Sequence, residues 1–219
     1  GWYKGFDGKI HQERAFDFRN DDWTWDTYRT LHPLMCILEP AAEVECLRSY
    51  IRMYEESGYM PTFPSFCGDR RGMINNHYAS IFWDAYAKGL RGFDLKKAYE
   101  GCKKTILERS IIPWYDGAPT SLDKFYTEHG YFPALGENET ETVGEVDTNW
   151  ELRQSVSVTL GQSFDDWCVA NMARAVGDKS GAELFEKRSL NYRNLFDSKI
   201  KFFAPKDKDG KFINFDTKC

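Results

Sequence analysis

The stretch that decides the fold is WELRQSVSVTLGQSFDDWCVANMARA, residues 150–175. Apolar side chains recur along it at intervals of three and four residues, which is the spacing of one face of an α-helix. On or near that face lie Leu152, Val156, Leu160, Phe164, Trp167 and Met172. The spacing therefore predicts a long helix that packs one side against other helices.

The same periodicity predicts five further helices. They cover about 21–38, 39–58, 77–88, 94–108 and 179–196. Asp21 or Asp22 is placed to cap the first, and Pro33 predicts a break near His32, because proline disrupts a helix interior. Gly58 predicts a left-handed end to the second helix.

Six helices in three antiparallel pairs, with little strand, predict an all-α fold built from helical hairpins. Two segments do not follow the helical pattern. Residues 110–149 lack sustained periodicity and predict a long irregular insertion. Residues 199–215 alternate loosely around Asp209-Gly210 and predict a short C-terminal hairpin.

Composition excludes several classes of function. The chain has 219 residues and a formal net charge of −5 without a basic cluster, which argues against nucleic-acid binding. No apolar run approaches the roughly 20 residues of a membrane span. Seven Trp, twelve Tyr and sixteen Phe either fill a core or line a sugar-binding surface, and composition does not choose between them.

The cysteines show no C-x-x-C pair, so zinc-ligand spacing is absent. Buried free thiols are the simplest interpretation, although a disulfide in an oxidising compartment stays open. The six positions are Cys36, Cys46, Cys67, Cys102, Cys168 and Cys219.

The strongest candidate for chemistry is the segment WTWDTYRTLHP, residues 23–33. Asp26 and Arg29 are three residues apart and share a helix face. A carboxylate, a guanidinium and indole rings suit a sugar, because carboxylates accept bonds from vicinal hydroxyls and indoles stack on C–H surfaces. The alternative is an intrahelical Asp–Arg pair beside core tryptophans.

Three other acidic or polar segments offer weaker candidates. The glycine-punctuated loop 66–77 precedes a helix start and is either a ligand loop or a solvated one. Asp165 and Asp166 are adjacent on a helix and point about 100° apart, so buried hydrogen-bonding carboxylates are favoured over a catalytic pair. The acidic residues 137–147 lack the spacing of an EF-hand.

Four segments together resemble glycoside hydrolase family 92, the calcium-dependent exo-acting α-mannosidases. Residues 25–34 (WDTYRTLHPL) are similar to its W-D-T-F-R-x-x-H-P-L stretch. Similar matches run through 73–89, 155–170 and 188–197. Two positions depart from the family pattern: Asn75-Asn76 replaces glycine plus Asp or Tyr, and Gly161-Gln162 replaces Glu-Tyr.

The resemblance implies an (α/α)6 toroid, of which residues 1–219 would form the first half. The family's N-terminal β-sandwich, and its later segments with the general acid, the general base and calcium ligands, would then lie outside this chain. On that basis no catalytic or metal-binding residue is expected before Cys219. The residues expected to contact mannose are Trp25, Asp26, Arg29 and His77.

The function implied is that of an inverting exo-α-mannosidase acting on terminal α-mannosides, for example α-1,2-linked ones. The isolated chain is expected to be inactive and to self-associate through exposed toroid faces. Export to the periplasm or the cell exterior is expected from the family alone. The alternatives are a non-enzymatic helical scaffold that binds glycan or protein, and a glycosidase of the same fold with another specificity.

Overall fold

The computed structural model describes residues 1–66 and 68–213, and helices dominate it. The helices are α1 (Thr24–Thr27), α2 (Leu31–Leu38), α3 (Pro40–Ser57), α4 (Tyr78–Ala87), α5 (Leu95–Glu108), α6 (Ser121–His129), α7 (Ser155–Val176), α8 (Lys179–Ser189) and the 3-10 helix η1 (Asn191–Leu195). Each strand pairs antiparallel with one partner, as β1 (Trp2–Lys4) with β2 (Ile10–Gln12), β3 (Pro64–Ser65) with β4 (Gly68–Asp69), and β5 (Phe196–Asp197) with β6 (Phe202–Phe203).

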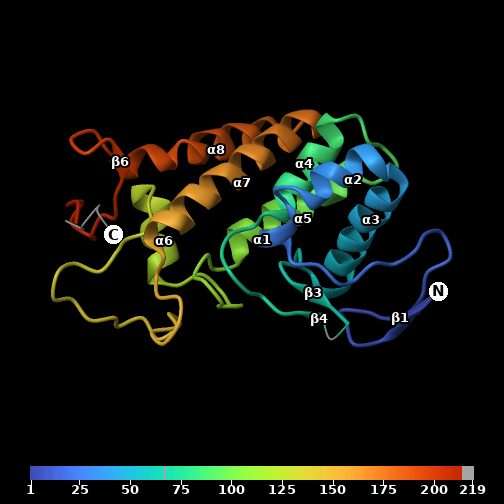
Figure 1. Cartoon of the computed structure of the whole chain (residues 1–219), viewed down its shortest axis with the longest axis horizontal. Coiled ribbons are helices and arrows are strands. Elements are labelled where there is room, and N and C mark those ends of the chain that lie inside the picture. Colours follow the sequence, from blue (N-terminus) through green and yellow to red (C-terminus); the bar gives the residue numbers. More distant parts are fainter. Residues whose placement is uncertain (67, 214–219) are drawn as a thin grey trace.

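Consecutive helices pack on one another, which confirms the predicted helical class. Helix α2 contacts α3, α4 contacts α5, and α7 contacts α8 along its length (Figure 1). Helix α7 also contacts α4 and α5 and so joins the pairs. The largest fully buried side chains between them include Leu47, Tyr50, Met53, Tyr78, Phe82, Met172 and Phe185. None of the helices in the described part of the chain is long and apolar enough to cross a membrane.

The first predicted helix is two helices, and its break lies earlier than Pro33 predicts. Helix α1 ends at Thr27 and α2 begins at Leu31, so Pro33 falls in the first turn of α2. Proline is tolerated in a first turn because the N–H it lacks has no intrahelical acceptor there. The prediction that Asp21 or Asp22 caps this helix was also wrong, since the residue before α1 is Trp23 and no side chain caps the helix.

Other helix ends follow their sequence signals. Gly58 ends α3 with a left-handed φ of 86°, and the carboxylate of Asp94 accepts a 3.0 Å hydrogen bond from the N–H of Lys97 at the start of α5. Helix α7 begins at Ser155 rather than at 150, and Trp150 is 72% exposed. The predicted helix therefore began five residues too early, because its apolar face was taken to start at Leu152, which is 55% exposed.

The prediction of an irregular segment over 110–149 was wrong for residues 121–129, which form α6. The sequence contains the capping residues of this helix at both of its ends. Thr120 and Asp123 make a reciprocal capping box, and Gly130 ends the helix at φ 74°. A helix of nine residues gives too few apolar repeats for periodicity to detect it, whereas its caps were present.

The tail turns twice rather than once. A β5–β6 hairpin that was not predicted comes first. The predicted Asp-Gly turn follows, with a bridge between Lys206 and Phe212 and a left-handed Gly210 at φ 80°. Residues 214 and 215 of the predicted hairpin lie outside the described residues.

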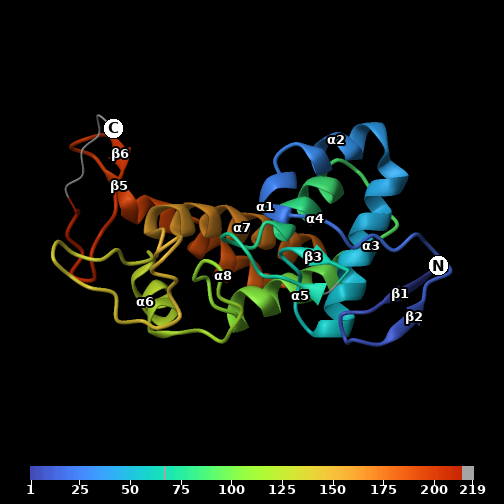
Figure 2. The same cartoon turned by 60° about the horizontal axis from the view of Figure 1, so that its bottom comes forward.

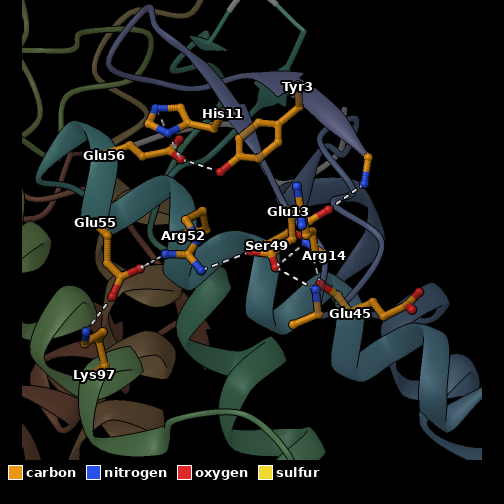
Figure 3. Close-up of polar contacts among 12 residues, drawn as sticks. Tyr3, His11, Glu13, Arg14, Glu45, Ser49, Arg52, Glu55, Glu56 and Lys97 are labelled. Atoms are coloured by element: carbon orange, nitrogen blue, oxygen red, sulfur yellow. Dashed lines mark hydrogen bonds and ion pairs between the residues drawn. The ribbon is translucent and has the colours of Figure 1, made fainter.

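The N-terminal β1–β2 hairpin is fastened to α3 by polar contacts (Figures 2 and 3). The Tyr3 hydroxyl donates to Glu56 at 2.6 Å, and Arg52 contacts both Glu13 and Glu55 at 3.0 Å. The Tyr3–Glu56 and Glu13–Arg52 contacts hold the N-terminal segment against α3, whereas the Arg52–Glu55 pair lies within α3 itself.

The cysteine prediction is confirmed for three positions. Cys36, Cys102 and Cys168 are buried free thiols, and Cys46 is free but partly exposed. Cys67 and Cys219 lie outside the described residues.

Candidate functional site

The segment that includes α1 presents Asp26 and Arg29 to solvent. The guanidinium of Arg29 lies over the Trp25 ring, 5.4 Å from its centroid, and over the Tyr28 ring at 5.2 Å. Such cation–π contacts contribute about 0.5–1 kcal/mol each at exposed sites. Arg29 is therefore directed onto the aromatic rings, and no Asp26–Arg29 ion pair forms.

Asp26 is exposed, and its carboxylate makes no hydrogen bond or ion pair with any residue that the structure describes. Its backbone N–H alone is engaged, with the carbonyl of Trp23 at 2.9 Å. The alternative of an intrahelical Asp–Arg pair is thus excluded for these residues. A free carboxylate beside a guanidinium and two rings is the arrangement expected of a polar-ligand site.

His77 lies beneath this surface rather than on it. Its ring is stacked on that of Tyr28, with centroids 4.0 Å apart and an interplanar angle of 19°. The residue is 3% exposed, and its Nδ1 lies 2.9 Å from the Asp165 carboxylate. The structure therefore connects His77 to Arg29 through Tyr28 and leaves almost none of its ring available to a ligand.

An aromatic groove adjoins the site. It has a volume of about 510 Å³ and lies between the turn after α1, α4 and α7. Trp83, Phe164 and Trp167 supply its rings, and Phe164 and Trp167 lie nearly parallel with centroids 6.5 Å apart. The sequence pattern placed Phe164 and Trp167 on the face of α7 that packs against other helices. In the structure, however, Phe164 is 42% and Trp167 49% exposed. Periodicity identifies a helix face but not whether a partner covers it.

Asp165 lies next to His77, and with Asp166 it confirms the prediction of buried hydrogen-bonding carboxylates. Both are fully buried. Asp165 accepts from His77 and from the backbone N–H of Asn76 at 2.7 Å, so it holds the start of α4. Asp166 pairs with Arg188 of α8 at 3.0 Å. Because neighbours on a helix diverge, the two carboxylates serve opposite sides of α7.

A second buried cluster supports the segment before Asp26. The ring of His32 lies between two carboxylates, 3.0 Å from Glu43 and 2.8 Å from Asp22, and Tyr50 also contacts Asp22. Burial opposes the charge on His32, but the two carboxylates outweigh it and raise the pKa of His32 to about 9. Asp22 thus ties the segment leading to Trp25 and Asp26 to α2 and α3.

Comparison with known proteins now assigns the chain. The family model described as the glycosyl hydrolase family 92 catalytic domain matches residues 1–218. The chain belongs to family 92. No curated protein matches it.

Solved structures of family 92 share the fold. The α-mannosidase BT3965 of Bacteroides thetaiotaomicron, in complex with mannoimidazole, is 26% identical with a TM-score of 0.79, and the match covers 99% of this chain. The inverting mannosidase BT2199 of the same species is 29% identical with a TM-score of 0.79 over 98% of this chain. The chain spans about a quarter of their length, 26% and 27% respectively.

The two departures from the family 92 sequence pattern touch each other. Asn75 adopts a left-handed φ of 68°, and its amide donates to the carbonyl of Val158 at 2.9 Å. A Cβ on Gly161 would lie only 2.0 Å from Asn75 Oδ1. Beside them, Asn76 donates to Gln162 at 2.8 Å. Asparagine at 75 therefore requires glycine at 161, and the two changes compensate each other.

Substitution of Gly161 by alanine is expected to lower the free energy of unfolding by about 2 kcal/mol, since the new methyl overlaps the Asn75 amide. The N75G change removes that amide, so the double variant N75G/G161A should show a favourable coupling of about 1–2 kcal/mol. Urea unfolding of the wild type, N75G, G161A and the double variant measures this coupling free energy. Additive losses would contradict the compensation.

The family 92 resemblance implies calcium with its ligands outside this chain, and the described residues do not themselves fit a calcium ion. Among the described residues no three His, Cys, Asp or Glu side chains are grouped as a metal ion requires. In the acidic segment 137–147, Glu139 pairs with Lys208 and Glu141 pairs with Arg153. We therefore derive no catalytic role for calcium from the described residues.

Proposed function

We propose that this chain forms part of the catalytic domain of an inverting, exo-acting α-mannosidase, and that its helices are the first half of an (α/α)6 toroid. Terminal α-mannosides, for example α-1,2-linked ones, are the proposed substrates. The observation that carries the proposal is Asp26, an exposed carboxylate with no partner among the described residues, beside Arg29 and the Trp25 ring. Membership of family 92 supports it.

The chemistry of these three side chains matches a pyranose. A carboxylate accepts hydrogen bonds from two neighbouring hydroxyls at once, and charge assistance makes such bonds roughly twice as strong as neutral ones. The Trp25 ring offers a flat surface to the C–H face of the sugar. Arg29, held over Trp25 and Tyr28, has donors for a third hydroxyl without a large entropic cost.

Cleavage with inversion needs a carboxylic acid that protonates the glycosidic oxygen and a carboxylate that activates water on the opposite side of the ring. The adjacent pair Asp165 and Asp166 does not supply them, because both are fully buried and engaged in hydrogen bonds. The chain is therefore proposed to bind sugar without cleaving it, the acid and base belonging to other parts of the catalytic domain.

The test measures turnover and binding on the same preparation. Purified chain is incubated with an aryl α-mannoside, and released phenol is recorded; none is expected. Affinity electrophoresis in gels that contain α-mannan should retard the chain, whereas galactan should not. Hydrolysis by the chain alone would overturn the proposed division of roles, and equal mobility in both gels would overturn the sugar site.

A second copy of the chain is proposed to cover the exposed face of α2. This face carries four large apolar side chains that are 47–69% exposed, namely Leu31, Leu34, Ile37 and Leu38. Contiguous apolar surface of this kind favours association. Sedimentation analysis is expected to show concentration-dependent dimers, and the L34E/I37E variant should remain monomeric. A wild-type chain that stays monomeric at all concentrations would contradict it.

A further inference from the structure

Helix α7 starts without a cap. The residue before it, Gln154, is left-handed with φ 43° and makes no side-chain cap. In the described part of the chain, the N–H groups of Ser155, Val156 and Ser157 have no hydrogen-bond acceptor. Helices α2, α3 and α4 also lack a side-chain cap, whereas side chains of Asp94, Thr120 and Asp178 accept from the first turns of α5, α6 and α8. Three donors at the positive end of a 22-residue helix are thus left open.

The side chain of Ser155 lies at the same place. Ser155 is 7% exposed, and within the described residues its hydroxyl has no hydrogen-bond partner. It lines a cavity of about 370 Å³ together with Gln154, Val156 and Ser157. A ligand oxygen in this cavity would give the Ser155 hydroxyl a hydrogen-bond partner.

The charges around the cavity favour an anion. Its one acidic wall residue among those described, Glu141, is neutralised by Arg153, whose Nη2 lies 2.7 Å from the carboxylate. The third Arg153 contact is with the carbonyl of Pro133 at 3.2 Å. Because the charges of Glu141 and Arg153 cancel, the electrostatic potential that remains in the cavity is the positive one from the N-terminus of α7.

The remaining wall is apolar. Leu135, Leu152 and Pro205 also line the cavity. A ligand that fits both parts of the lining carries an oxygen-rich anionic group and a compact apolar body.

We propose that the N-terminus of α7 binds an oxyanion, the carboxylate or phosphate group of a small molecule. The N–H groups of Ser155, Val156 and Ser157 donate to its oxygens, and the Ser155 hydroxyl donates a fourth bond. The site does not depend on the sugar-binding proposal, because it uses none of Trp25, Asp26 or Arg29.

The test is a ¹H–¹⁵N NMR titration of the full chain with inorganic phosphate and, separately, with acetate, at constant ionic strength. Saturable shifts of the amides of Ser155, Val156 and Ser157 are expected with at least one of the two, and the one that binds tighter identifies the anionic group. The capped amides of Lys97 and Gly181 serve as internal controls and should not move.

Two variants separate binding from general salt effects. S155A should weaken binding about fivefold, the value of one hydrogen bond of about 1 kcal/mol. S155D places a carboxylate of the chain itself at the helix N-terminus and should abolish binding while leaving the fold intact. Absence of saturable shifts with both anions, or binding by S155D equal to wild type, would overturn the proposal.

Discussion

Replacing Arg188 by methionine is expected to lower the free energy of unfolding by about 3–5 kcal/mol, as is typical when one partner of a buried ion pair is removed. Asp166 is fully buried, and burial raises the pKa of its carboxyl while the Arg188 guanidinium 3.0 Å away opposes the rise. Among the described residues, only the amide of Gln162 then remains as a hydrogen-bond donor to Asp166. Urea unfolding of wild type and R188M measures the loss.

The double variant D166N/R188M serves as the matched control. It removes both charges, so it should recover much of the stability that R188M loses. A loss below about 1 kcal/mol in R188M, a value ordinary for exposed pairs, would show that this ion pair does not hold α8 on α7.

Raising the pH from 6.5 to above 9 is expected to remove about 3 kcal/mol of stability. Asp22 and Glu43 raise the folded-state pKa of His32 from 6.5 to about 9. A group whose pKa is higher when folded stabilises the fold fully below its unfolded pKa. That contribution is lost as the pH rises through the folded value, when the ring between two carboxylates loses its proton.

The control for this prediction is H32Q, which keeps a polar side chain between Asp22 and Glu43 but does not titrate. Chemical denaturation at intervals between pH 6 and 10 should give a smaller slope for H32Q than for wild type. Equal slopes would contradict the assignment of this pH dependence to His32.

The helices were predictable where local chemistry determines them. Asp94 and Gly58 are single residues whose capping roles follow from their own side chains, and both ends were confirmed. Helix α6 was missed because its signal is a pair, Thr120 with Asp123, and only the periodicity of its apolar residues was considered. The break before Leu31 depends on tertiary contacts of Asp22 and His32, which neighbouring sequence does not reveal.

The sequence pattern named Trp25, Asp26 and Arg29 as sugar contacts, and that role stays a prediction. The structure adds that the Arg29 guanidinium lies over the Trp25 ring and that Asp26 is exposed. The sequence pattern did not indicate that His77 is covered by Tyr28, because a stacking partner from another segment depends on the fold. For the same reason, contact between Asn75 and Gly161 could not be foreseen from their separate positions.

The most direct test of the sugar site is a ¹H–¹⁵N NMR titration of the chain with methyl α-D-mannoside. The account predicts saturable shifts of the Trp25 indole and of the Asp26 and Arg29 amides. They should be retained in D21N, which neutralises an exposed carboxylate earlier in the same segment, and lost in D26N. The absence of saturable shifts in wild type, or equal shifts in D26N, would contradict it.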